Sequence, residues 1–156
     1  MNSRGFTLVE LIVTVVIVGL LATVAMPLAE LTVRRAKETE LRTALRDIRT
    51  AVDAYKLATE QGRVVTELGA SGYPADLDSL VTGVEDAKSP KRVQIYFLRR
   101  LPRDPLYPDR TAVASVTWGL RSYESSPDNP QRGADVFDIY SLAEGDGLDG
   151  VPYRDW

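Results

Sequence analysis

The side chains that most often carry chemistry are missing from this sequence, because its 156 residues contain no cysteine and no histidine. Thiolates and imidazoles are the usual zinc ligands, nucleophiles and near-neutral bases, so catalysis would depend on carboxylates, hydroxyls, lysine or tyrosine. The candidate carboxylate pairs, Asp76 with Asp78 and Asp104 with Asp109, lie in proline-rich sequence typical of surface turns and helix caps. We therefore expect a protein that is not an enzyme.

An acidic, glycine-rich loop at residues 141–150 has the composition of a site for a hard cation. Calcium takes about six to eight oxygen ligands from carboxylates and carbonyls on a flexible backbone. The candidate oxygen ligands are those of Ser141, Leu142, Asp146 and Asp149, with Glu144 or Asp138 as a further donor. The alternative is an ordinary solvated acidic turn. A calcium ion at this place would be structural.

The overall charge gives no basic surface for nucleic acid, since 19 Lys+Arg against 22 Asp+Glu leave a net charge of −3. Arg99, Arg100 and Arg103 form one compact basic cluster. We expect this cluster to pair with acidic neighbours in an assembly rather than with nucleic acid.

One carboxylate, Glu10, stands inside an apolar segment that extends over residues 6–26. As an α-helix this segment would be roughly 31 Å long, enough to cross the hydrocarbon core of a bilayer. A charge in lipid costs at least about 2.5 kcal/mol and usually indicates a partner. Two simpler interpretations, a signal peptide cleaved near residues 23–25 and a plain signal anchor, leave Glu10 unexplained.

The helix that begins in this segment is predicted to continue to about Thr59, a length of roughly 80 Å. Pro27 lacks a backbone donor, so we expect a kink or a locally melted turn there. Residues 32–40 are polar on every side and are expected to be solvent-exposed, with Glu38 and Arg42 spaced as an i,i+4 pair.

Beyond this polar stretch, apolar residues recur with the helical spacing i, i+3, i+4, i+7. They are Leu41, Ala44, Leu45, Ile48, Ala51, Val52, Tyr55 and Ala58. The polar residues expected to face outward are Arg42, Arg46, Asp47, Arg49, Asp53 and Lys56. The pattern predicts a helix with one core-facing side that ends at Gly62.

Glycine, proline and aspartate interrupt the chain after this helix, which predicts a small head made of short elements. Residues 73–81 favour a short helix, and residues 116–121 and 136–142 favour two antiparallel strands. The predicted fold class is α+β, a lollipop with one long kinked N-terminal helix packed on a small antiparallel β-sheet head of two to four strands.

The segment GFTLVE at residues 5–10, followed by the apolar run and Pro27, resembles the class III signal of type IV pilins and type II secretion pseudopilins. The resemblance implies that prepilin peptidase cuts after Gly5 on the cytoplasmic side and that the new amino terminus on Phe6 is methylated. The apolar helix then stays on the protein. Glu10 would pair with the Phe6 ammonium of a neighbouring subunit when the helices pack into a filament.

This resemblance divides the chain into four parts. A leader peptide covers residues 1–5, a transmembrane and polymerisation helix covers residues 6–27, the amphipathic half of the helix covers residues 28–60, and a periplasmic head covers residues 61–156. The implied protein is a single-pass protein of the inner membrane whose N-terminus is cytoplasmic before processing.

A narrower resemblance, to the major pseudopilin of the general secretion pathway protein G type, is carried by residues 73–74, 101–105, 118–119 and 137–142. It implies a structural calcium in the final loop, although residues 143–144 and the short tail depart from that pattern. The implied partners are further copies of the chain, minor pseudopilins, the prepilin peptidase/methyltransferase and an inner-membrane assembly platform.

The function that follows from this resemblance is a structural subunit of a periplasmic pseudopilus that drives protein export across the outer membrane. One alternative is a major or minor pilin of a type IV pilus, acting in adhesion, motility or DNA uptake. A second alternative, of another class, is an exported periplasmic domain whose signal peptide is removed.

Overall fold

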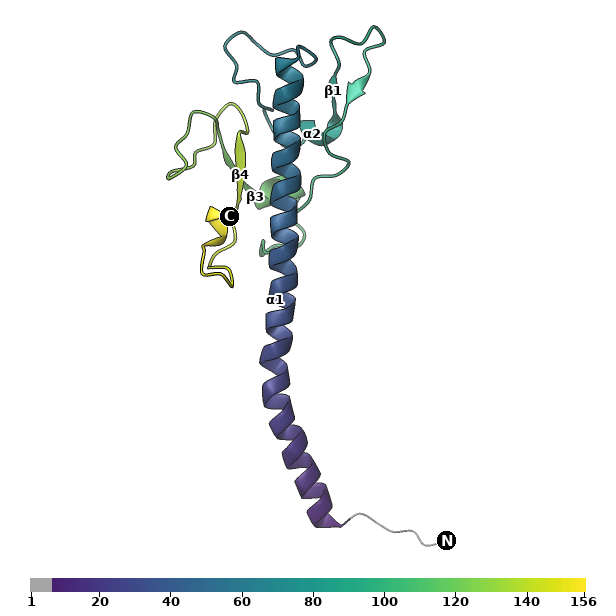
Figure 1. The fold of residues 1–156 in the computed structure, drawn as a ribbon, viewed down its shortest axis with the longest axis vertical. Helices are drawn as coiled ribbons and strands as arrows, with labels where there is room; N and C mark the ends of the chain where they lie inside the picture. Colours follow the sequence, from purple (N-terminus) through teal and green to yellow (C-terminus); the bar gives the residue numbers. More distant parts are fainter. Residues whose placement is uncertain (1–6) are drawn as a thin grey trace. The chain divides into compact units, whose positions relative to one another are not determined.

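The computed structural model describes residues 7–156, apart from the side chains of Val24 and Pro27. It confirms the α+β class, because the described residues form one long N-terminal helix followed by short helices and small antiparallel sheets (Figure 1). The elements are α1 (Leu8–Glu60), α2 (Ser79–Thr82), β1 (Val84–Glu85), β2 (Gln94–Ile95), the 3₁₀ turn η1 (Ala114–Thr117), β3 (Trp118–Arg121), β4 (Asp138–Ser141) and the 3₁₀ turn η2 (Tyr153–Asp155).

The chain forms two compact units, Met1–Lys37 and Glu38–Trp156. Within the first unit, the structure describes a helical segment whose large apolar side chains are exposed to solvent. The assigned helix passes through residue 27 without interruption. The locally melted turn expected there is therefore not seen, and the Pro27 side chain itself lies outside the described residues.

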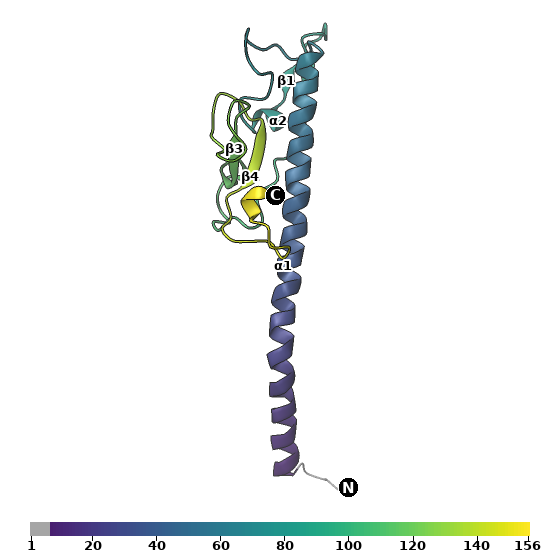
Figure 2. The same ribbon diagram turned by 60° about the vertical axis from the view of Figure 1, so that its left-hand side comes forward.

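The second unit is built around the remaining part of α1. All eight residues of the predicted apolar stripe between Leu41 and Ala58 are buried, which confirms the helical spacing read from the sequence. They pack with apolar residues of α2, β3 and β4 in one core. In two views, β3 and β4 lie alongside this part of α1 (Figures 1 and 2). Full burial of one leucine or isoleucine side chain contributes roughly 1.5–3 kcal/mol, so this stripe is a main source of head stability.

Helix α1 ends where the sequence indicates. Gly62 has a φ of 68°, a left-handed conformation that glycine adopts without the steric cost of a Cβ atom. The Gly62 amide donates to the Thr59 carbonyl at 2.8 Å and the Arg63 amide donates to the Ala58 carbonyl at 2.9 Å. These bonds satisfy carbonyls of the last turn and release the chain into the loop that follows.

The two predicted antiparallel strands are confirmed as β3 and β4, with Trp118 opposite Ser141 and Leu120 opposite Ile139. Gly119 faces Tyr140, and the aromatic ring occupies the space that a Cβ atom at residue 119 would need. Among the described residues β1 and β2 pair only with each other, so the head holds two separate two-stranded sheets in place of the single sheet that we expected.

Two local predictions are wrong in their bounds. In place of the helix expected over residues 73–81 the structure has only the short α2, and the Pro74 carbonyl accepts a bond from the distant Val136 amide at 2.8 Å instead of one from a following turn of helix. Asp76 then starts the short helix by accepting the Ser79 amide at 2.8 Å. Val116, expected in a strand, lies in η1 and is exposed.

Candidate functional site

The start of helix α1 is fixed by a pair of reciprocal hydrogen bonds between Thr7 and Glu10. The Glu10 carboxylate accepts the Thr7 amide at 3.1 Å and the Thr7 hydroxyl at 3.0 Å, and the Glu10 amide donates to the Thr7 hydroxyl oxygen at 3.3 Å. This arrangement is a capping box, in which the side chains of the cap residue and of the third helical residue satisfy each other's backbone donors. The sequence carries the signature of this box, a threonine followed three residues later by glutamate before an apolar run, so the box was a local feature that could have been predicted.

The capping box gives Glu10 a role within the single chain in addition to the predicted pairing between subunits. Gly5 and Phe6, the predicted cleavage and methylation positions, lie outside the described residues. The predicted ion pair between Glu10 and a neighbouring Phe6 amine therefore stays a prediction.

The helical segment after Glu10 is long enough and apolar enough to cross a membrane. Its two threonine hydroxyls are satisfied by the helix itself, since Thr14 donates to the Glu10 carbonyl at 2.6 Å and Thr23 donates to the Leu20 carbonyl at 2.7 Å. In lipid, where no water can satisfy a hydroxyl, such bonds to the preceding turn remove the main cost of a threonine.

The first 26 residues decide what kind of signal this segment is. Residues 1–26 match the prokaryotic N-terminal methylation motif. The chain carries a type IV prepilin-like signal. No curated protein and no solved structure shows a significant match to the chain. A motif of this kind implies processing by prepilin peptidase and assembly into a pilus-like filament, and it indicates a structural subunit of the type IV pilin-like class. Together with the apolar helix, it fits a membrane-anchored pilin with a periplasmic head.

At the other end of the chain, the predicted calcium ligands Asp149 and Ser141 have partners within the protein, and Leu142 and Asp146 are exposed on the loop. The Asp149 carboxylate pairs with the Arg42 guanidinium at 2.5 Å and accepts the Val151 amide at 3.1 Å. These bonds, first the one from the Val151 amide and then those from Arg42, hold the pKa of Asp149 below its usual range. Ser141 is buried and its hydroxyl donates to Asp104 at 2.5 Å.

The two further candidate ligands are placed differently. Asp138 lies between two guanidinium groups, with Arg49 at 2.8 Å and Arg121 at 3.3 Å. Glu144 is exposed on the loop. In the part of the chain that the structure describes, no three carboxylates converge in a way that could hold a metal ion. The calcium site stays a prediction.

Glu38 corrects the expectation that residues 32–40 are exposed on every side, because it is buried, with only 7% of its surface exposed. Its carboxylate oxygen Oε1 accepts the Leu148 amide at 3.0 Å and the Tyr153 hydroxyl at 2.9 Å. A buried carboxylate that receives two donors is compensated for the loss of water. Periodicity could not reveal this, since the partners lie more than a hundred residues along the chain.

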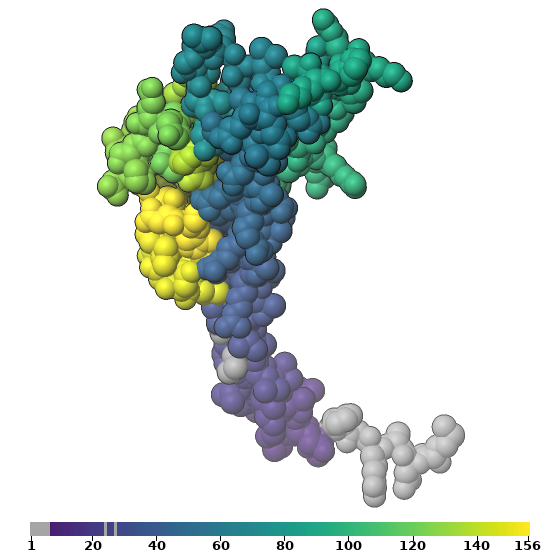
Figure 3. All heavy atoms as spheres, turned by 45° about the horizontal axis from the view of Figure 1, so that its top comes forward, coloured from purple at the N-terminus to yellow at the C-terminus, as the bar shows by residue number. Residues whose placement is uncertain are grey.

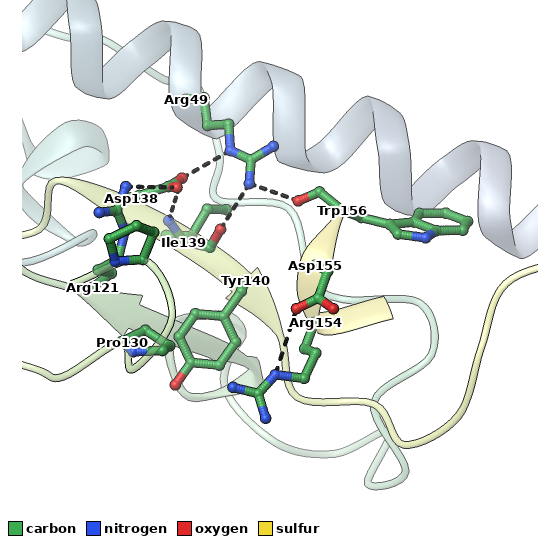
Figure 4. A pocket seen from close by; sticks show the side chains of 10 residues that line it. Arg49, Arg121, Pro130, Asp138, Ile139, Tyr140, Arg154, Asp155 and Trp156 are labelled. Atoms are coloured by element: carbon green, nitrogen blue, oxygen red, sulfur yellow. Dashed lines mark hydrogen bonds and ion pairs between the residues drawn. The ribbon is translucent and has the colours of Figure 1, made fainter. Parts of the chain in front are cut away.

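Arg49 was expected to face outward, but it is half-buried and lines a cavity of about 260 Å³ between α1, β4 and η2 (Figure 4). Its Nη2 atom donates to the Ile139 carbonyl at 3.1 Å and to the Trp156 carbonyl at 2.7 Å. Figure 4 shows the guanidinium group reaching from the helix toward Asp138 on one side and Trp156 on the other. The charged groups of this cavity are paired with one another and serve to hold the head together.

Asp104 and Asp109, the second candidate carboxylate pair, each accept hydrogen bonds from a residue two positions further along the chain. Asp109 accepts the amide and the hydroxyl of Thr111, which hold its pKa below the usual range. Asp104, expected in surface sequence, is instead almost fully buried and accepts the Leu106 amide at 2.7 Å.

In the basic cluster, Arg99 and Arg100 are exposed, whereas Arg103 is half-buried and donates to the carbonyls of Asp109 and Arg110.

Proposed function

We propose that this protein is a pseudopilin of a type II secretion system, a structural subunit that assembles through its N-terminal helix into a periplasmic filament driving protein export. The observation that carries the proposal is the prepilin-like signal at residues 1–26 directly joined to a helix whose apolar surface is exposed in the single chain. An exposed apolar surface of this length needs either lipid or other subunits to cover it.

The proposed route to the filament uses Glu10. Cleavage after Gly5 would leave a positive amine on Phe6, four residues before Glu10 in the sequence. In a membrane or a helix bundle, a carboxylate without a positive partner is costly, so a neighbouring Phe6 amine offered at the right axial offset stabilises that offset over others. The capping box with Thr7 supports this role, because it holds the Glu10 carboxylate at the end of the helix from which the amine would approach.

The choice of a secretion pseudopilus over a pilus is supported by the head. The segments that carry the narrower resemblance meet in space, since the Trp118 indole donates to the Pro102 carbonyl at 2.9 Å and Ser141 donates to Asp104. Trp118 and Ser141 also face each other across β3 and β4. These residues therefore belong to one structural centre of the head.

The amino terminus of the protein purified from membranes tests the proposal most directly. Mass spectrometry is expected to find a chain that begins with N-methylated Phe6. A chain that begins at Met26 or nearby would instead indicate an exported domain with a removed signal peptide, and would contradict the filament function.

Assembly is tested with Glu10→Ala and with Glu30→Ala as the matched control, since both acids are exposed on the same helix. Glu10→Ala is expected to be processed but to lose cross-linked multimers by more than about tenfold, because the uncompensated amine costs at least about 2.5 kcal/mol in lipid. Glu30→Ala should assemble as wild type. Equal assembly of the two variants would refute the pairing role.

A deletion strain distinguishes the secretion function from the pilus function. We expect secreted enzymes to accumulate in the periplasm, with restoration by the wild-type chain and not by Glu10→Ala. Intact secretion together with lost surface pili or lost twitching motility would assign the protein to a type IV pilus.

A further inference from the structure

The last part of the head, residues 142–156, has little regular structure of its own, with η2 as its one helical turn in this range. It carries the carboxylates of Glu144, Asp146, Asp149 and Asp155 and one arginine, Arg154. Figure 3 shows this segment, in yellow, lying against the part of α1 that belongs to the same unit. The backbone hydrogen bonds of the segment, such as those from the Gly147 amide to Val151 and from the Tyr153 amide to Gly145, join it to itself, so its attachment to the helix depends on side chains.

Three side chains of α1 supply such contacts. Glu38, Arg42 and Arg49 are spaced i, i+4 and i+11, which places them along one side of the helix. We call these three residues the helix clamp. Glu38 receives the Leu148 amide and the Tyr153 hydroxyl, and Arg49 donates to the Trp156 carbonyl.

Arg42 is the central member of the helix clamp and makes two contacts with the segment. Its guanidinium pairs with the Asp149 carboxylate, and it also lies over the Trp156 ring, with its Cζ atom 4.0 Å from the ring centroid. Arginine suits this place because its planar group can hydrogen-bond at its edge and stack on an aromatic ring with its face. The Trp156 indole in turn donates to the Val151 carbonyl at 3.2 Å, which closes the loop on itself.

Three of the candidate calcium ligands, Asp149, Asp138 and Ser141, are engaged by other groups of the protein. Calcium requires about six to eight oxygens that converge on one point. Here the Asp149 carboxylate is directed to Arg42, the Asp138 carboxylate to Arg49 and Arg121, and the Ser141 hydroxyl to the buried Asp104. Within the segment, Asp149 pairs with Arg42 of the helix and Asp155 pairs with the neighbouring Arg154.

We infer that Arg42 and Arg49 provide the cationic groups for the acidic C-terminal segment, so that this segment is ordered on helix α1 without a divalent metal ion. Glu38 is the negatively charged member of the helix clamp. Its carboxylate accepts the Leu148 amide and the Tyr153 hydroxyl, which are donors and need an acceptor rather than a cation. The inference concerns the head alone and holds or fails independently of the secretion function.

The first test compares the full-length protein in detergent micelles with excess EDTA and with millimolar calcium. Hydrogen exchange of peptides from residues 144–156, followed by mass spectrometry, is expected to be the same in both conditions, as is the melting temperature followed by circular dichroism. Faster exchange in EDTA that calcium reverses would overturn the inference and assign the positive charge to a metal ion.

The second test compares Arg42→Ala with Arg46→Ala, an exposed arginine one turn further along α1 that contacts Thr43. Arg42→Ala is expected to speed exchange of residues 144–156 roughly five- to tenfold, the size expected for loss of an exposed ion pair and a cation–π contact. Arg46→Ala should leave this exchange unchanged. Equal exchange in the two variants would remove Arg42 from the helix clamp.

Exchanging the charges of Arg42 and Asp149 distinguishes loss of their ion pair from loss of a side chain. Arg42→Asp and Asp149→Arg should each speed exchange of the segment, and the double variant should recover most of the protection because the ion pair is restored with opposite sign. A calcium site would be destroyed by Asp149→Arg in either background. A double variant no better protected than the worse single variant would therefore contradict the inference.

Discussion

The two parts of helix α1 differ in what surrounds them, although they belong to one helix. In the part before residue 38, the large apolar side chains that the structure describes between Leu8 and Val33 are 43% to 75% exposed. In the part from Glu38 onward, the apolar stripe from Leu41 to Ala58 is 0% to 8% exposed and forms the centre of the head core. Between Leu11 and Ala29 the first part carries no charged side chain on any side, whereas the second is apolar on one side only.

This difference shows that one helix can serve two kinds of packing. The second part obtains its partners from its own chain, so it contributes to the stability of a single subunit. The first part has its partners outside the chain, in lipid or in other subunits, so it contributes to anchoring and assembly. Substitutions in the two parts should therefore change different measurable quantities.

The largest expected difference between the two parts of α1 comes from truncating one isoleucine in each. Ile48→Ala should lower the free energy of unfolding of the head by about 3 to 4 kcal/mol, because Ile48 is fully buried and leaves a cavity. Ile17→Ala should change it by less than about 0.5 kcal/mol, since Ile17 makes no contribution to the head core. Denaturant unfolding of the two variants in micelles measures both values, and similar losses would show that the two parts stabilise the same unit.

A second pair of variants adds a methyl group to a glycine in each region. Gly119→Ala should cost about 1 to 3 kcal/mol, because the new Cβ atom would overlap the Tyr140 ring. Gly19→Ala has open space around it and should favour the helix by about 0.5 to 1 kcal/mol without moving the unfolding transition of the head. Thermal unfolding followed by circular dichroism tests the pair, and a tolerated Gly119→Ala would mean that Tyr140 can move aside.

The smallest expected effect concerns the pH dependence of the head, which the apolar part of α1 should not share. The Arg63 guanidinium holds the pKa of Asp86 below its usual range through bonds of 2.7 and 3.0 Å, aided by the Lys88 amide. Because the folded-state pKa is lowered, this pair stabilises the head above the unfolded-state pKa and loses that effect as the pH falls through the folded-state value.

Asp86→Asn should therefore lower the melting temperature at neutral pH and reduce its further decrease in acid, below about pH 4. Asp47→Asn, a change of the same kind at an exposed residue of α1, is the control. Melting temperatures over a pH series measure the effect. Parallel pH profiles for wild type and Asp86→Asn would show that Asp86 is not responsible.

The sequence predicted those parts of the fold that depend on neighbours along the chain. The apolar run, the stripe from Leu41 to Ala58 and the stop at Gly62 are periodic or local signals, and the structure agrees with each of them. The two strands followed from alternation and were also found. The capping box was equally local and could have been predicted from Thr7 and Glu10.

Other features depended on contacts between distant residues. Glu38 and Arg49 look like solvent-facing residues in the helical pattern, and only the return of the C-terminal segment gives them buried or half-buried partners. Asp104 resembles a turn residue until Ser141 is placed beside it. For the same reason, the composition of the acidic loop and the resemblance together suggested calcium, but neither could show that Arg42 pairs with Asp149 or Arg49 with Asp138.

The placement of the two tryptophans allows unfolding of the head and detachment of its C-terminal segment to be followed separately. Trp118 is 3% exposed in the head core, and Trp156 lies partly exposed beneath Arg42. These are the two tryptophans of the sequence, so the protein holds one natural fluorophore in its core and one on its C-terminal segment. The emission of Trp118 should stay at short wavelength until the head unfolds, whereas that of Trp156 should shift to the red when the segment alone comes away. Detachment of the segment and loss of the core could thus be timed separately by light, with no added label.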